Sequence, residues 1–409
     1  MRLPGAAMAS TSFSLKLVYG VHMKIVVLGG YGEIGACIST DLAETARDTE
    51  VVIAGRDGAK AESLVRALKA KHLSPATVDA SRKDSVMAAL KGTDVVINAT
   101  NYYMNVDIMK IALASNANYI DLGGLFHTTL EQLKLSKEFE KKGLLAFLGC
   151  GSTPGITNLL ALHGANQLDK VESIHIQFGD KDYTKYTTPI VVPYSMHTVF
   201  DEFTMRPAVF EAGKMKFVEP LTGDIDVVFP QPVGKTTCRY SLHSEVATLP
   251  MSFKHKGIKA CTFRGGWDND FIYKTKFLID AGFSSYDPII VDGVRVKPRN
   301  VAVSLLNKFI PGKDVKIDDL EYLRIAVTGK KGAKKVTIAE YCKSVANKRW
   351  NIPSGTWDTG VPPSIVAQMI AKGEITSKGA LPPEQTDIEL NDLFRELKRR
   401  SIEVFNKVE

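Results

Sequence analysis

Three glycines follow the first apolar run of the chain at a spacing that could bind a nucleotide. Gly30, Gly32 and Gly35 form the pattern GxGxxG directly after the apolar residues 25–28, and a helical pattern begins behind them. In a strand–turn–helix unit, Gly30 would allow the turn, Gly32 would let the backbone approach a pyrophosphate, and Gly35 would let the helix pack on the strand. A glycine turn in another kind of α/β protein is the alternative. We expect a dinucleotide site in this loop, formed by Gly30, Tyr31, Gly32, Glu33, Ile34 and Gly35, with phosphates at the helix N-terminus.

An arginine follows the second apolar run and bears on which dinucleotide could bind. Residues 51–55 end in Gly55 and are followed by Arg56 and Asp57, about 20 residues beyond the glycines. An acid at this strand tip would bind a ribose 2′-OH, whereas a guanidinium can bind a 2′-phosphate through two hydrogen bonds. Arg56 therefore favours NADP over NAD. The alternative is a solvated arginine before a helix that Asp57 caps.

Two further strand tips are expected to line the same site. Ligands of open parallel sheets bind beyond the carboxyl ends of the strands. Asp79 and Ala80 follow the third strand and are expected near the adenine, although Asp79 could instead cap a helix. The fourth strand, 93–100, ends in residues that we expect near the nicotinamide half: Ala99, Thr100 and Asn101.

These sites require a sheet whose strands alternate with helices. Six apolar runs alternate with helical patterns up to about residue 150, which predicts a Rossmann sheet. Between 171 and 348 the expected strands are longer, alternate polar with apolar residues and are antiparallel in character, as at 235–244. With a hairpin in 322–341, they predict an inserted α+β domain. Helices are expected at about 129–142, at 359–375 and at 387–407. We therefore expect an α/β fold with a disordered extension at 1–22, a dinucleotide-binding domain formed by 23–150 and 350–409, and a substrate or dimerisation domain at 151–349.

The composition limits the class of protein. A chain of 409 residues with a net charge of +7, 44% hydrophobic residues and no block of like charge is typical of a globular protein. It does not indicate a nucleic-acid surface, and no apolar run is long enough for a membrane helix. The five cysteines are scattered and lack metal-ligand spacing. We expect a reducing, cytoplasmic compartment and no structural metal.

The segment GCGSTPGITN (149–158) introduces a family resemblance. Together with GGYGEIG, AGRD, VVINAT, NYIDLGG, SLHSEVATLP and TGVPPSIVAQMIAKGEI, it makes the chain from Met23 onward resemble the saccharopine dehydrogenase family. The resemblance implies NADP(H) or NAD(H) binding, hydride transfer at a carbon–nitrogen bond, and often a dimer. Two departures stand where substrate contacts are expected: Thr153 replaces a common acid, and Arg264 is followed by Gly265, Gly266 and Trp267.

The resemblance suggests which residues could act on a substrate. Hydride transfer to an imine needs a proton at the amine nitrogen and cationic anchors for carboxylates. Candidates for proton transfer or for lining the site are Asp121, Tyr102 and Cys150, with a structural carboxylate, nicotinamide packing and an inert thiol as the respective alternatives. Candidates for the amino-acid-like substrate are Arg206, Arg239, Arg264 and His243.

Three functions therefore compete. The first is an NADP-dependent enzyme of lysine metabolism that resembles saccharopine reductase. The second is a lysine dehydrogenase or a carboxynorspermidine dehydrogenase, and the third is an NADP-binding sensor or scaffold without turnover. For an enzyme of this family we expect a homodimer.

Overall fold

The computed structural model describes residues 23–310 and 314–409, so the predicted extension at 1–22 lies outside the described residues. The chain forms two compact units. Unit 1 contains the described residues up to 159 together with 358–400, and unit 2 contains 160–357 and 401–409. These boundaries differ from the predicted segment 350–409, of which both ends belong to unit 2.

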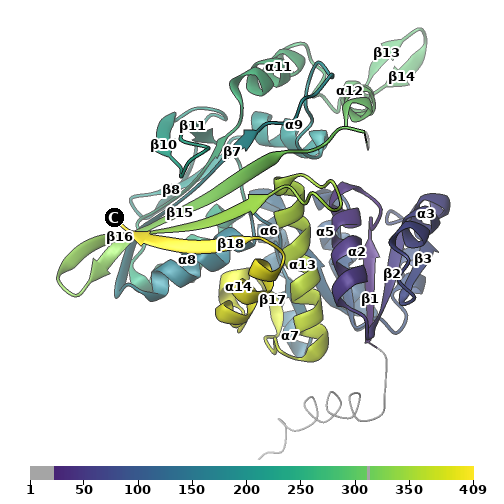
Figure 1. Cartoon of the computed structure of the whole chain (residues 1–409), viewed down its shortest axis with the longest axis horizontal. Helices are drawn as coiled ribbons and strands as arrows, with labels where there is room; N and C mark the ends of the chain where they lie inside the picture. The colour runs from purple at the N-terminus through teal and green to yellow at the C-terminus, as the bar shows by residue number, and fades with distance from the viewer. Residues whose placement is uncertain (1–22, 311–313) are drawn as a thin grey trace, which may run out of the picture. The chain divides into compact units, whose positions relative to one another are not determined.

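Unit 1 is built on a parallel sheet of seven strands (Figure 1). The strand order is β17-β6-β5-β4-β1-β2-β3. The chain starts at β1 inside the sheet, adds β2 and β3 on one side, and then adds β4, β5 and β6 on the other side. All strand pairs in this sheet are parallel, which confirms the predicted Rossmann topology. The strands are β1 (Met23–Leu28), β2 (Thr49–Gly55), β3 (Leu73–Thr77), β4 (Val95–Asn98), β5 (Asn118–Asp121), β6 (Leu145–Phe147) and β17 (Gly379–Leu381).

The helices of unit 1 bury an apolar core against this sheet. One cluster joins β-branched residues of the strands to the helices that follow them, including Val26, Val96 and Ile108. The predicted single helix at 129–142 is wrong, because the chain forms two helices that part at residues 134–135. The helices are α2 (Glu33–Thr45), α3 (Gly58–Leu68), α4 (Lys83–Ala89), α5 (Asn105–Ala114), α6 (Leu125–Leu133), α7 (Ser136–Lys141), α13 (Ser354–Lys372, from residue 358) and α14 (Leu390–Arg399).

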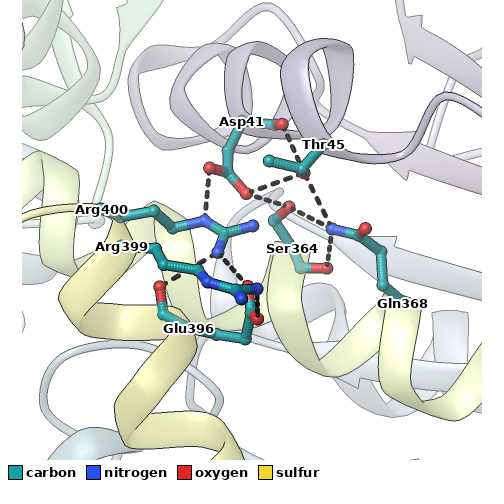
Figure 2. A network of polar contacts seen from close by, with 7 residues as sticks. All are labelled: Asp41, Thr45, Ser364, Gln368, Glu396, Arg399 and Arg400. Atoms are coloured by element: carbon teal, nitrogen blue, oxygen red, sulfur yellow. Dashed lines mark hydrogen bonds and ion pairs between the residues drawn. The ribbon is translucent and has the colours of Figure 1, made fainter.

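A buried polar network joins α2 to the two late helices of unit 1 (Figure 2). The Asp41 carboxylate on α2 accepts hydrogen bonds from Arg400 Nε and Ser364 Oγ, both at 2.6 Å. Arg400 also donates to Glu396 on α14 at 2.8 Å, and Gln368 on α13 donates to Thr45 at 3.0 Å. The segment 358–400 is thereby fixed to the helix that follows the glycine loop.

Unit 2 is built on a larger mixed sheet. Its main path is β10-β11-β12-β7-β15-β16-β18, with β8 and β9 paired beside β12. β7 (Lys170–Asp182) runs antiparallel to β15 (Asp319–Lys331) but parallel to β12 (Ala260–Gly266). The expectation of antiparallel strands is therefore wrong for that one pair. The other strands are β8 (Ala208–Glu211), β9 (Lys214–Phe217), β10 (Ile225–Val228), β11 (Lys235–Tyr240), β16 (Lys334–Val345), β18 (Glu403–Val408) and the separate hairpin β13 (Ile289–Val291) and β14 (Val294–Val296).

Two sequence expectations that concern the strands of unit 2 have different outcomes. The hairpin expected in 322–341 is confirmed, because β15 and β16 pair in antiparallel register from Leu320–Val345 to Lys331–Lys334. The helix expected at 387–407 is wrong beyond Arg399. Residues 403–408 instead form β18 against β16, where the Phe405 ring stacks on Tyr341 with centroids 5.2 Å apart.

Five helices accompany the strands of unit 2. They are α8 (Ile156–Asn166, from residue 160), α9 (Met196–Thr204), α10 (Glu245–Ser252), α11 (Asn269–Asp280) and α12 (Pro298–Leu306). The strand expected to run to residue 244 ends at Tyr240, and α10 begins at Glu245. Across the described ranges 23–310 and 314–409, no helix is long and apolar enough to cross a membrane.

Candidate active site

The glycine loop between β1 and α2 has the geometry that a pyrophosphate requires. Gly29 has a φ of 75°, and a side chain at Gly35 would collide with the Gly29 carbonyl. The left-handed residue of the turn is thus Gly29 and not Gly30, which corrects the role expected for Gly30. Gly32 is the N-cap of α2 and supplies no side-chain cap, so the first N–H groups of the helix fit a phosphate.

The end of β2 presents an arginine beside this loop. Arg56 is exposed, and within the described part of the chain its guanidinium forms no hydrogen bond or ion pair. Asp57 instead caps α3, because its Oδ1 accepts a hydrogen bond from the Lys60 N–H at 3.2 Å. The carboxylate at this strand tip is therefore engaged in the helix cap, while the guanidinium remains available to a ligand.

Asp79 lies beyond β3, within electrostatic range of Arg56. Its Oδ1 accepts hydrogen bonds from the Ser81 hydroxyl at 2.7 Å and the Ser81 N–H at 3.0 Å. These hydrogen bonds lower the pKa of Asp79 below its ordinary value, and Arg56 and Arg82 lower it further. The neighbouring Ala80 is half-buried and packs against the apolar core of unit 1.

A buried network of side-chain amides underlies the ends of β4 and β5. Asn98 donates to Asn105 Oδ1 at 2.9 Å and to Tyr119 OH at 3.1 Å, and it accepts hydrogen bonds from the Thr100 N–H and hydroxyl. Asn105 in turn donates to the Gly123 carbonyl at 3.0 Å. The network fixes the tip residues 99–101 at the carboxyl edge of the sheet. Ala99 continues β4 by donating its N–H to Leu28 O at 2.9 Å.

Asp121, a candidate for proton transfer, lies in this buried layer. Its side chain is fully buried, and Oδ1 accepts hydrogen bonds from the N–H groups of Gly123 at 2.9 Å and Gly149 at 2.8 Å. Oδ2 accepts a hydrogen bond from the Gln132 amide. Burial raises the pKa of Asp121, while these donors oppose the rise. The geometry favours a carboxylate that joins the turn after β5 to the loop after β6 over one that exchanges protons with a ligand.

The other two candidates for chemistry differ in exposure. Tyr102 is half-buried in a 3-10 turn (Tyr102–Met104), where its ring contacts the edge of Tyr103 with centroids 5.9 Å apart. The Tyr103 hydroxyl accepts a hydrogen bond from Asn101 at 2.7 Å. Cys150 is 2% exposed, and burial raises the pKa of its thiol well above the ordinary value. A protonated, buried thiol is a poor nucleophile.

The three arginines expected to bind carboxylates all have partners inside unit 2. Arg206 is exposed and pairs with Glu219 at 3.0 Å. Arg239 pairs with Asp224 at 3.2 Å. Arg264 lies over the Tyr240 ring, 3.9 Å from its centroid, and donates to the Tyr240 hydroxyl and to Gly223 O.

The fourth expected substrate residue, His243, lies in a buried acidic cluster. Its Nδ1 is 3.0 Å from Glu245 Oε2, and its Nε2 is 3.6 Å from Glu202 Oε1. The imidazole stacks on Phe263 with centroids 3.7 Å apart. Burial favours the neutral ring, but the two carboxylates outweigh it and raise the pKa of His243 to about 9. The imidazole is thus flanked by two buried carboxylates.

Aromatic residues extend this cluster into the core of unit 2. The Tyr194 hydroxyl donates to Glu202 and accepts a hydrogen bond from Trp267 Nε1 at 3.3 Å. Trp267 is 6% exposed and packs among Phe178 and Phe203. Trp267, which departs from the family pattern, therefore packs in the core of unit 2 and hydrogen-bonds to the tyrosine that contacts Glu202.

Family comparisons agree with this architecture. The saccharopine dehydrogenase NADP binding domain matches residues 25–147, and the saccharopine dehydrogenase C-terminal domain matches residues 151–402. The chain belongs to the saccharopine dehydrogenase family. It is an NAD(P)-dependent oxidoreductase of this family, and the glycine loop and α2 are the part of it that fits a nicotinamide dinucleotide.

Three proteins resemble the chain over most of its length at low sequence identity. Carboxynorspermidine synthase of Vibrio alginolyticus is 24% identical over 366 residues, which cover 83% of this chain and 86% of that protein. Carboxyaminopropylagmatine dehydrogenase of Synechocystis is 20% identical over 382 residues, or 89% and 93% of the two chains. Saccharopine dehydrogenase (L-Glu forming) of Saccharomyces cerevisiae has the same fold, with a TM-score of 0.73 at 17% identity over 95% of this chain and 100% of that one.

Several residues of the site were not predicted. Asn98 stands in an otherwise apolar strand, and a polar residue in such a run was the available signal. Asn105 and Gln132 lie on helices whose sequence pattern does not reveal that they face the ends of β4 and β5. The sequence does not mark Glu202 as a site residue, because the fold of unit 2 brings it close to His243 from a distant part of the chain.

Proposed function

We propose that the chain is an NADP-dependent oxidoreductase that acts on the CH–NH bond of an amino-acid-derived secondary amine carrying a further protonated amine. The observation that carries this proposal is the buried cluster in which the carboxylates of Glu202 and Glu245 flank His243. A buried carboxylate pair suits an ammonium group of a substrate, because each carboxylate can accept charge-assisted hydrogen bonds.

The three arginines that were expected to bind carboxylates are already paired within the protein, which supports a substrate with few carboxylates. Saccharopine carries three carboxylates, and each would need a cationic partner. Arg206, Arg239 and Arg264 each have a partner within unit 2. Two relatives are named for carboxylated amines with further nitrogen atoms, carboxynorspermidine and carboxyaminopropylagmatine. The proposal therefore places this chain with the polyamine members of the family rather than with saccharopine reductase.

Arg56 supports NADP as the cofactor. It is exposed at the end of β2, and Asp57 beside it is engaged in capping α3. When bound, the dinucleotide supplies the hydride. The chain's own residues bind and orient it, and of the three candidates for proton transfer Tyr102 is the one that we retain.

A comparison of substrate pairs tests the function. NADPH oxidation is measured with 1,3-diaminopropane plus aspartate semialdehyde, and with glutamate plus α-aminoadipate semialdehyde. We expect turnover with the first pair to exceed turnover with the second by at least tenfold. Preference for the second pair would assign the chain to the saccharopine type. Tight NADPH binding without turnover on either pair would favour the sensor.

A charge reversal tests the cofactor separately. Arg56→Asp should lower the affinity for NADPH by at least about tenfold, because the variant loses a charge-assisted contact and adds repulsion, while NADH affinity changes less than about threefold. Arg66→Asp, on an exposed arginine of α3, is the matched control and should leave both affinities unchanged. Equal losses for NADPH and NADH in the Arg56 variant refute the NADP assignment.

The assembly and the compartment are also proposed on the family resemblance and the cysteines. We propose a homodimer, which light scattering coupled to gel filtration would measure directly. All five cysteines are buried and free, as suits a reducing cytoplasm. Among the described residues no group of three or more His, Cys, Asp or Glu is arranged to hold a metal.

A further inference from the structure

Tyr31 connects the glycine loop to the strand tip that carries Arg56. The residue lies between Gly30 and Gly32, and its ring packs directly on Gly55 at the end of β2, where any side chain at position 55 would collide with it. Its hydroxyl accepts a hydrogen bond from the Asp57 N–H at 2.8 Å. A single side chain of the phosphate loop thus contacts the residues on both sides of Arg56.

Backbone hydrogen bonds also fix the residues on either side of Arg56. The Gly55 carbonyl accepts a hydrogen bond from the Val78 N–H at 2.9 Å, which continues the pairing of β2 with β3. The Asp57 carbonyl accepts one from the Ala61 N–H at 3.2 Å, as the first turn of α3. With both neighbours held, the backbone at Arg56 has little freedom, and the direction of its side chain is restricted.

The Tyr31 hydroxyl has hydrogen-bonding capacity to spare. It accepts the Asp57 N–H, and across residues 23–310 and 314–409 its own proton has no acceptor. A phenol can donate one hydrogen bond while it accepts another. Tyr31 is half-buried, and it contacts the two neighbours of Arg56, whose side chain is exposed and has no partner among the described residues. A phenol and a guanidinium presented from adjoining backbone are suited to an anionic oxygen.

From these contacts we propose that Tyr31 determines dinucleotide specificity together with Arg56: its hydroxyl donates a hydrogen bond to the 2′-phosphate and holds the Arg56–Asp57 turn in the orientation that lets the guanidinium reach the same group. The inference rests on the proposed NADP preference and goes beyond it, because it gives the phosphate a second, uncharged donor from the glycine loop. Without the phenol, the turn would lose the hydrogen bond at Asp57 N–H and the ligand would lose one donor.

The variant Tyr31→Phe tests this role, because it removes the hydroxyl and keeps the ring on Gly55. The affinities of four ligands are measured by calorimetry: NADPH, NADH, 2′,5′-ADP and 5′-AMP. We expect the variant to lose about tenfold in affinity for NADPH and 2′,5′-ADP, as for one hydrogen bond to a charged group, and less than twofold for NADH and 5′-AMP. Tyr273→Phe, on an exposed tyrosine of α11, is the control and should change none of the four.

The outcomes separate this inference from the cofactor assignment. If the wild type prefers 2′,5′-ADP over 5′-AMP and Tyr31→Phe keeps that preference in full, the role of Tyr31 is refuted while the assignment of NADP stands. If the wild type shows no preference, both are refuted. A loss of equal size for all four ligands also overturns the inference, since it would indicate damage to the loop. In the variants Tyr31→Phe, Arg56→Gln and their double, we expect the two single effects to be non-additive, because both groups contact one phosphate.

Discussion

The Arg400 guanidinium and the Asp41 carboxylate form an ion pair in which both side chains are more than 90% buried, with Nε and Oδ1 2.6 Å apart. The pair joins residues 359 positions apart in the sequence. It fixes the end of α14 to α2, the helix that begins at the glycine loop (Figure 2). Removing one partner of such a pair leaves a buried charge without compensation.

We predict that Arg400→Met lowers the free energy of unfolding of unit 1 by about 3 kcal/mol. The physical reason is that Asp41 stays buried and keeps only its hydroxyl donors. Arg399→Met is the control, since Arg399 is 65% exposed in its pair with Glu396 and should contribute less than about 1 kcal/mol. Urea unfolding followed by far-ultraviolet circular dichroism measures both. Equal losses in the two variants would contradict the prediction.

Asp121→Asn distinguishes a structural from a proton-transferring carboxylate. Because Asp121 accepts hydrogen bonds from two backbone N–H groups and Gln132, we expect a loss of about 2 kcal/mol in stability and weaker NADPH binding. The pH profile of kcat, measured on the activity that the variant retains, should keep the shape that it has in the wild type. Disappearance of one limb of that profile would instead assign proton transfer to Asp121.

A third prediction concerns Cys150. Its thiol is buried with a raised pKa, so Cys150→Ala should keep kcat within about threefold of the wild type and cost about 1 kcal/mol of stability through the lost sulfur contacts. Native protein should also resist iodoacetamide at pH 8, as mass spectrometry of the alkylated peptide would show. Rapid labelling of Cys150 with parallel loss of activity would count against an inert thiol.

His243 should make stability depend on pH above neutrality. Its pKa rises from about 6.5 to about 9 on folding, so its contribution of about 3 kcal/mol is fully present below pH 6.5 and is lost as the pH rises through 9. The stability of the wild type relative to His243→Gln should therefore fall between pH 6.5 and 9. His255→Gln, at a histidine outside the acidic cluster, provides the control, and a flat difference across that range would exclude the charged pairing with Glu202 and Glu245.

The sequence predicts unit 1 better than unit 2 for a physical reason. Strands β1 and β2 are buried on both faces, so they appear as the apolar runs 25–28 and 51–55, and the glycines mark the first turn. β17 was missed because three residues cannot display a period. In unit 2, residues 403–408 follow the strongly amphipathic helix α14 without a clear break, and only the pairing with β16 makes them a strand.

The site was predictable in position more than in role. The tips of parallel strands could be located from the sequence, which placed Arg56, Asp79 and residues 99–101 at the carboxyl edge. The role of Asp121 depends on Gln132 and Gly149, which reach it only after α6 and β6 are packed. The engagement of Arg264 by Tyr240 likewise depends on the pairing of β11 with β12, which no local pattern reveals.

β17 and β18 have a consequence for how the chain is made. The sheet of unit 1 receives its edge strand from residues 379–381, and the sheet of unit 2 receives one from residues 403–408, after the chain has already left each unit once. A ribosome-bound chain that has emerged as far as residue 370 therefore exposes the free edge of β6 and the free edge of β16 at the same time. Such edges can pair with other strands. Nascent chains of this protein should consequently depend on chaperone binding until both late strands have emerged.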